Sequence, residues 1–129
     1  MRPFRLVGVF PEEQRLLEWR WDMRTLETLH FGWEPRHWFS SGLSDEQAAE
    51  QRDEICRAAW QEADAGSQDW LRRLHRAHGT APGPFSVCVH RQDVRTLSYT
   101  EIERSPARLR MAYLEGGPCT ASRWLESTL

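Results

Sequence analysis

The sequence contains no lysine, so all 17 of its basic residues are arginine. They stand among 19 acidic residues, and the formal net charge is -2. The arginines are scattered and the acids interleave with them, so the chain has no basic stripe of the kind that nucleic acid requires. We therefore expect no nucleic-acid partner.

Cysteine is scarce. The three cysteines, Cys56, Cys88 and Cys119, are widely spaced and odd in number. Zinc sites commonly show closely spaced ligand pairs, and disulfide frameworks use an even set of cysteines. The sequence therefore predicts no metal site, no cofactor and no disulfide framework, and it favours a reducing compartment.

Long apolar runs are also absent. No stretch approaches the roughly 20 apolar residues that a helix needs to cross a bilayer. The run that follows Met1–Arg5 is too short for a signal peptide. We expect a soluble, cytoplasmic protein that has no membrane partner.

The composition is that of ordinary globular material. Of the 129 residues, 40% are hydrophobic and 28% are charged, and seven tryptophans and five phenylalanines supply large apolar side chains. A chain of this length suits one domain with one core. We predict a single α+β domain over residues 1–129.

Three strands are expected in the first third of the chain, at Phe4–Phe10, Arg15–Asp22 and Thr25–Phe31. The first is almost continuously apolar, as a buried strand is. The second alternates apolar and polar side chains, which is typical of a half-buried strand.

Two helices should follow. Ser44 begins a capping-box pattern, which predicts a helix from Asp45 to about Ala63. Ser67 is suited to cap a second helix, and Gly79 to stop it.

The last part reads as an antiparallel meander of Phe85–Val89, Arg95–Arg104 and Leu109–Tyr113. Residues 115–129 are expected to form a loose tail or a short helix. The order of strands, two helices and strands predicts an α+β fold in which two main helices pack on antiparallel sheets.

Alternation along Phe85–Val89 would place Ser86, Cys88 and His90 on one side of a strand. A cysteine and a histidine so placed are able to share a proton or to bind a metal ion. No third partner stands at a suitable spacing, and a small cysteine on a strand usually just packs. A metal or redox site at Cys88 and His90 is the weakest of our functional hypotheses.

Two other polar groups have a plain structural explanation. His75 and His78 lie three apart on the second predicted helix, but a histidine pair without an acidic ligand is a weak zinc signal. Ser40 and Ser41 precede a helix N-terminus, where anions bind, although such residues also simply begin helices.

Several stretches taken together resemble the C-terminal half of the NRDE family, also called the transport-and-Golgi-organisation family. They are Trp19–Asp22, Trp38–Leu43, Phe85–Asp93, Thr96–Thr100 and Gly116–Cys119. Members of that family look like N-terminal-nucleophile hydrolases. The resemblance implies that this chain is similar to the C-terminal half of their αββα sandwich.

In that family the cysteine directly after the initiator methionine is the proposed nucleophile, and an Asn-Arg-Asp-Glu stretch follows. This chain begins Met1-Arg2-Pro3 and contains neither feature. Such a nucleophile relies on its own α-amine as the base. We therefore assign no catalytic residue and expect no catalysis by the isolated chain.

Two main functional hypotheses remain. The chain is a C-terminal half that pairs with a separate N-terminal half-protein or forms a homodimer, and it acts as an amide hydrolase only if so completed. Alternatively, it is a self-sufficient module that binds a small molecule or a protein. Strand faces and the resemblance together suggest one candidate pocket, formed by Ser40, Ser41, Cys88, His90 and Arg91.

Overall fold

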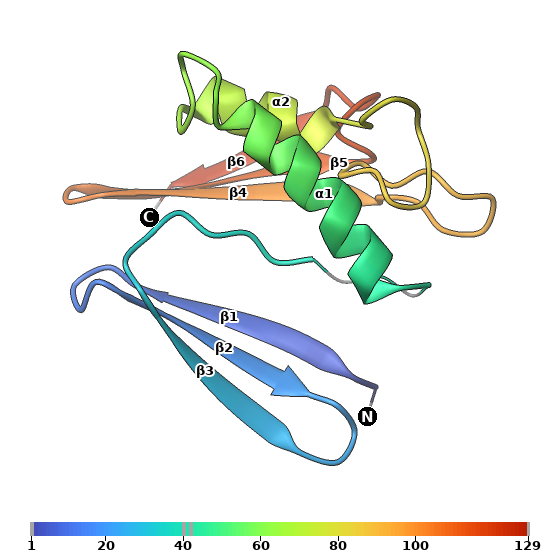
Figure 1. Ribbon diagram of the computed structural model, residues 1–129. Coiled ribbons are helices and arrows are strands. Elements are labelled where there is room, and N and C mark those ends of the chain that lie inside the picture. The colour runs from blue at the N-terminus through green and yellow to red at the C-terminus, as the bar shows by residue number, and fades with distance from the viewer. Residues whose placement is uncertain (1, 40, 42, 129) are drawn as a thin grey trace. The chain divides into compact units, whose positions relative to one another are not determined.

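The computed structural model describes residues 2–39, 41 and 43–128 (Figure 1). Ser40 of the predicted pocket lies outside the described residues. The chain separates into two compact units, an N-terminal unit (Met1–Trp38) and a C-terminal unit (Phe39–Leu129). The single domain over residues 1–129 stays a prediction.

The N-terminal unit is a three-stranded antiparallel sheet of β1 (Phe4–Phe10), β2 (Arg15–Trp21) and β3 (Leu26–Gly32), in that order. All three predicted strands are confirmed to within a residue at each end. The turn between β2 and β3 is closed by Asp22, whose Oδ1 accepts hydrogen bonds from the backbone N–H groups of Arg24 and Thr25, both at 2.7 Å.

A buried carboxylate is the centre of this unit. Glu18 of β2 is fully buried and forms ion pairs with Arg5 and Arg20. Trp38 Nε1 also donates to Glu18 Oε2 at 2.8 Å. Burial acts to raise the pKa of Glu18, but the hydrogen bonds and positive charges together outweigh it and lower the pKa. The ionised carboxylate thereby ties Trp38 to β2.

The C-terminal unit contains helices α1 (Asp45–Ala59) and α2 (Gln68–Arg76) and a sheet of β4 (Ser98–Ser105), β5 (Arg108–Glu115) and β6 (Trp124–Thr128). The sheet is antiparallel, in the order β4-β5-β6. Figure 1 shows both helices on one side of it. Two helices and two antiparallel sheets confirm the predicted α+β class.

Both helices begin at the predicted caps. Ser44 Oγ accepts from the Gln47 backbone N–H at 3.2 Å, and Ser67 Oγ accepts from the Trp70 backbone N–H at 3.1 Å. Helix α1 ends at Ala59, earlier than predicted. The Trp70 indole N–H donates to the Ala59 carbonyl oxygen at 2.8 Å, so a side chain of α2 satisfies this terminal carbonyl and joins the two helices.

The predicted strand Phe85–Val89 is wrong. The segment forms turns and bends, and an isolated bridge between His90 and Arg95 follows it. Its backbone groups bond to partners other than a neighbouring strand. The Arg52 Nε donates to the carbonyl oxygens of Phe85 and Ser86 at 3.2 and 3.1 Å, which fastens the segment to α1.

The third strand of the meander comes instead from the end of the chain. The loose tail or short helix predicted for residues 115–129 is wrong at 124–128, because β6 pairs with β5. Trp124 anchors it: its ring lies edge-on to Tyr99 at 5.9 Å between centroids, and the Arg72 guanidinium lies 4.7 Å from the Trp124 ring centroid.

The register of the sheet places apolar side chains on the face away from Tyr99 and Trp124. Ile102, Met111 and Leu125 lie on this face and are 68%, 45% and 51% exposed.

Neither described helix has both the length and the apolar character that a helix needs to cross a bilayer.

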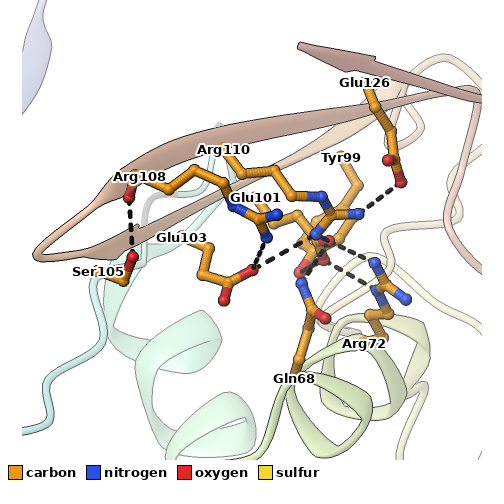
Figure 2. A network of polar contacts seen from close by, with 9 residues as sticks. All are labelled: Gln68, Arg72, Tyr99, Glu101, Glu103, Ser105, Arg108, Arg110 and Glu126. Atoms are coloured by element: carbon orange, nitrogen blue, oxygen red, sulfur yellow. Dashed lines mark hydrogen bonds and ion pairs between the residues drawn. The ribbon is translucent and has the colours of Figure 1, made fainter. Parts of the chain in front are cut away.

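A network around Glu101 holds α2 on the other face of the sheet (Figure 2). Glu101 is 6% exposed. Arg72 Nε donates to Glu101 Oε2 at 3.0 Å, and Gln68 Nε2 donates to Oε1 at 2.9 Å. The hydrogen bond from Arg72 lowers the pKa of Glu101, whereas burial, followed by the Glu101 charge, raises the pKa of Tyr99 to about 12. The network therefore fastens α2 to β4.

We expect Glu101→Gln to lower the free energy of unfolding by about 1.5–3 kcal/mol, because the charged acceptor of two arginines is lost. The Glu101 pKa is lowered in the folded state, so its stabilisation is present above the unfolded value of about 4.3 and is lost as pH falls through the folded value. Urea unfolding of both proteins across this pH range measures the difference.

The matched control is Glu103→Gln, which removes a half-exposed carboxylate of the same strand. It should leave stability nearly unchanged, because exposed ion pairs contribute little. Equal destabilisation by both substitutions, or a Glu101→Gln effect that persists in strong acid, would contradict the role given to Glu101.

Candidate metal centre

Four side chains of the C-terminal unit that could hold a metal ion meet at one point: His78, Cys88, His90 and Cys119. Their ligand atoms all lie within 4.8 Å of one another. His78 Nε2 is 3.1 Å from His90 Nε2, His90 Nε2 is 3.2 Å from Cys119 Sγ, and Cys88 Sγ is 3.4 Å from Cys119 Sγ. Three separate segments of the chain contribute these ligands.

The first segment follows α2. At the end of α2, the Ala77 backbone N–H donates a hydrogen bond to the Leu74 carbonyl oxygen at 3.0 Å. The Ala77 carbonyl oxygen accepts one from the Cys88 backbone N–H at 3.1 Å. This bond brings Cys88 beside the start of the loop that carries His78. The position of His78 therefore depends on where α2 ends.

Ser86 shapes the loop between the two segments. It is 4% exposed, and its hydroxyl accepts from the Gly83 backbone N–H at 2.9 Å and donates to the His78 carbonyl oxygen at 3.1 Å. The Gly83 carbonyl oxygen in turn accepts from the His90 backbone N–H at 3.0 Å. Ser86 thus positions two ligands through the backbone.

Thr96 closes the second segment, which carries Cys88 and His90. Its hydroxyl accepts from the Val89 backbone N–H at 2.8 Å, and its own backbone N–H donates to the Val89 carbonyl oxygen at 3.1 Å. Burial raises the pKa of the Cys88 thiol, although hydrogen bonds from the Cys119 backbone and the Thr96 side chain oppose this effect.

The third segment is the turn after β5. Gly116 has φ +99°, a left-handed conformation that favours glycine. At Gly117, a Cβ atom would lie 3.3 Å from the Thr96 carbonyl oxygen and 3.7 Å from Cys88 Sγ. The two glycines let the backbone turn sharply and approach Cys88 closely, so that the Cys119 thiol faces the other ligands.

This arrangement fits a tetrahedral zinc ion. Zinc bonds of about 2.3 Å to sulfur and 2.0–2.1 Å to nitrogen place neighbouring ligand atoms about 3.3–3.8 Å apart. The three contacts of 3.1, 3.2 and 3.4 Å are slightly shorter than those values, and the remaining pairs lie within 4.8 Å, so the side chains would shift modestly in both directions to bind the ion. Two thiolates and two neutral imidazoles also balance the charge of Zn²⁺, and tetrahedral S₂N₂ sets favour zinc.

A disulfide does not account for the sulfur contact. A covalent S–S bond is about 2.05 Å long, whereas these sulfur atoms are 3.4 Å apart, and all three cysteines are free.

No protein-family model, curated protein or solved structure matches this chain. The resemblance to the NRDE family, and the half-protein partner that it implies, therefore stay predictions. The geometry of the four ligands is the strongest functional evidence in the described residues.

Of the predicted pocket residues, the structure brings Cys88 and His90 together. Arg91 instead pairs with Asp93, with Nε 2.7 Å from Oδ1. Ser41 lies before the Ser44 cap of α1, where its hydroxyl accepts from the Leu43 backbone N–H at 3.1 Å. With Ser40 outside the described residues, the pocket of five residues stays a prediction.

Sequence reasoning missed His78 and Cys119 as partners of this pair. It coupled His78 with His75, but His75 is a helix residue whose ring lies 4.8 Å from the Tyr99 ring, and burial lowers its pKa. The only local signal was the Cys-x-His spacing at 88–90. The prediction of no metal site rested on spacing, and the contacts in space are reason to revise it.

Proposed function

We propose that the C-terminal unit is a zinc-binding module whose metal ion is structural. The observation that carries the proposal is the convergence of two imidazole nitrogens and two thiol sulfurs within 4.8 Å. His78, Cys88, His90 and Cys119 would hold the ion. Bound zinc would supply a cross-link between three segments and no reaction.

A structural role follows from the number of ligands. Catalytic zinc sites keep a position open for water or substrate, whereas sites with four protein ligands are closed. Here the chain itself offers four ligand atoms, which is the number that a closed tetrahedral set needs. This favours the hypothesis of a self-sufficient binding module, in which zinc holds the scaffold and another surface binds the partner.

The segments that carry the ligands need such a cross-link. Residues 77–97 contain no strand or helix, only turns, bends and one isolated bridge. Cys88 and Cys119 are 31 positions apart in the chain. Closing a loop of this length in the unfolded chain costs entropy, and a metal ion bound by both ends offsets that cost.

The purified, reduced protein is expected to bind one zinc ion per chain by elemental analysis. Replacing zinc with Co²⁺ should give the intense visible absorption of a tetrahedral site together with thiolate-to-cobalt charge transfer, since geometry and ligand type are both diagnostic. Protein with iodoacetamide-blocked thiols is the control. Failure to take up zinc when folded protein is equilibrated with excess metal would refute the proposal, as would a weak octahedral Co²⁺ spectrum.

A further inference from the structure

We propose that this centre is sensitive to oxidation: a peroxide joins Cys88 to Cys119 as a disulfide, and the zinc ion is released. The inference rests on the proposed function, since it concerns the metal-loaded form. It adds a regulatory property that a structural zinc site does not itself require.

The geometry favours bond formation between the two sulfur atoms. Cys88 Sγ and Cys119 Sγ lie 3.4 Å apart and face each other from two different turns. A disulfide needs an approach to about 2.05 Å. Gly116 and Gly117 immediately precede the turn of Cys119 and carry no side chain, whereas Pro118, the residue directly before Cys119, is buried.

The two cysteines differ in their access to solvent, which sets the order of events. Cys88 is completely buried, whereas Cys119 is partly exposed. Peroxide therefore meets Cys119 first, and Cys88 stands behind it as the resolving thiol. A pair consisting of an accessible cysteine and a nearby resolving cysteine is the arrangement that redox-sensing thiols use.

The chemistry balances in two steps. The Cys119 thiolate attacks one peroxide oxygen, so an S–O bond forms, the O–O bond breaks, and hydroxide leaves. The Cys88 thiolate then attacks Cys119 Sγ, so the S–S bond forms, the S–O bond breaks, and a second hydroxide leaves. The two thiolates lose two electrons in total, peroxide gains them, and zinc remains Zn²⁺ throughout.

Loss of the metal follows from the product. A disulfide provides neither of the two anionic sulfur ligands, and its sulfur atoms are too close together to occupy two corners of a zinc tetrahedron. His78 and His90 would be left as two neutral ligands. Two imidazoles alone bind zinc far more weakly than the full set, so the ion would leave.

The test uses the zinc-loaded, full-length Cys56→Ala protein, which contains only the two thiols of interest. Cys56 is buried on α1 and is not among the four ligands. During hydrogen peroxide treatment, a colorimetric chelator reports free zinc, and peptide mass spectrometry reports the Cys88–Cys119 disulfide. We expect one zinc released per disulfide formed, and zinc uptake again after dithiothreitol.

The outcomes separate the two proposals. Retention of zinc under peroxide, or release that accompanies sulfinic acid without a disulfide, would overturn this inference and leave the zinc site standing. Protein that binds no zinc before any oxidant is added would overturn both. Cys119→Ser provides a further check, since it should form no disulfide at any peroxide concentration.

Discussion

Removal of zinc by a chelator is expected to lower the free energy of unfolding of the C-terminal unit by about 4 kcal/mol. This value applies if the free zinc concentration before removal is about 1,000 times the dissociation constant. The buried apolar residues of this unit are mostly small, such as Ala48, Cys56, Ala59 and Ala112. Small side chains bury little apolar area, so they stabilise a fold weakly. The metal ion would therefore supply a large share of the unit's stability.

The loss should be greatest where regular structure is absent. Amide hydrogen exchange is expected to rise over residues 77–97 and around Cys119, because the hydrogen bonds there are turn and loop bonds. The strands β4 and β5 pair along eight residues each and should keep more protection.

Exchange measured by mass spectrometry, with and without the chelator, locates the effect, and thermal unfolding gives its size. Chelator presaturated with zinc is the control for direct effects of the chelator. If metal analysis shows that zinc has gone while stability and exchange are both unchanged, the ion does not hold the fold together.

The parts of the fold that the sequence predicts are those that local chemistry determines. β1 and β2 follow from short-range patterns of apolar residues, and Asp22 closes the turn to β3 with its own side chain. Ser44 and Ser67 cap their helices with a hydroxyl that reaches only three residues along the chain. None of these features needs a distant partner.

The errors have a common physical origin in long-range contacts. Phe85–Val89 has a strand-like pattern of side chains. Two of its carbonyl oxygens, however, accept hydrogen bonds from Arg52, which lies 33 and 34 residues earlier in the chain. Trp124 begins β6, and its ring packs against the Tyr99 ring and the Arg72 guanidinium, which are both distant in the sequence. Such competition for backbone groups and apolar surface overrides local propensity.

The candidate site was half predicted for the same reason. Cys88 and His90 stand two residues apart, so the sequence alone associates them. His78 and Cys119 join them only because α2 ends at Arg76 and the glycine turn follows β5. The network around Glu101 holds α2 on the sheet, yet it comes from residues that show no metal-binding pattern.

The comparison of two neighbouring histidines gives the sharpest test of the ligand set. His78→Ala is expected to reduce zinc affinity by more than the roughly 10–100-fold that loss of an outer-shell partner costs, because a direct ligand is removed. His75→Ala should retain one zinc per chain, since the His75 ring lies against Tyr99 and is not among the ligands. Competition with a chromophoric chelator measures both affinities.

The four ligands should also behave as one unit. Once His78 is replaced by alanine, the additional substitution Cys119→Ala should cost far less affinity than it does in the intact protein, because the closed tetrahedral set has already been broken. Cys56→Ala in place of Cys119→Ala is the matched control and should leave zinc affinity unchanged. Strictly additive losses, or equal losses from His75→Ala and His78→Ala, would mean that these side chains do not share one metal ion.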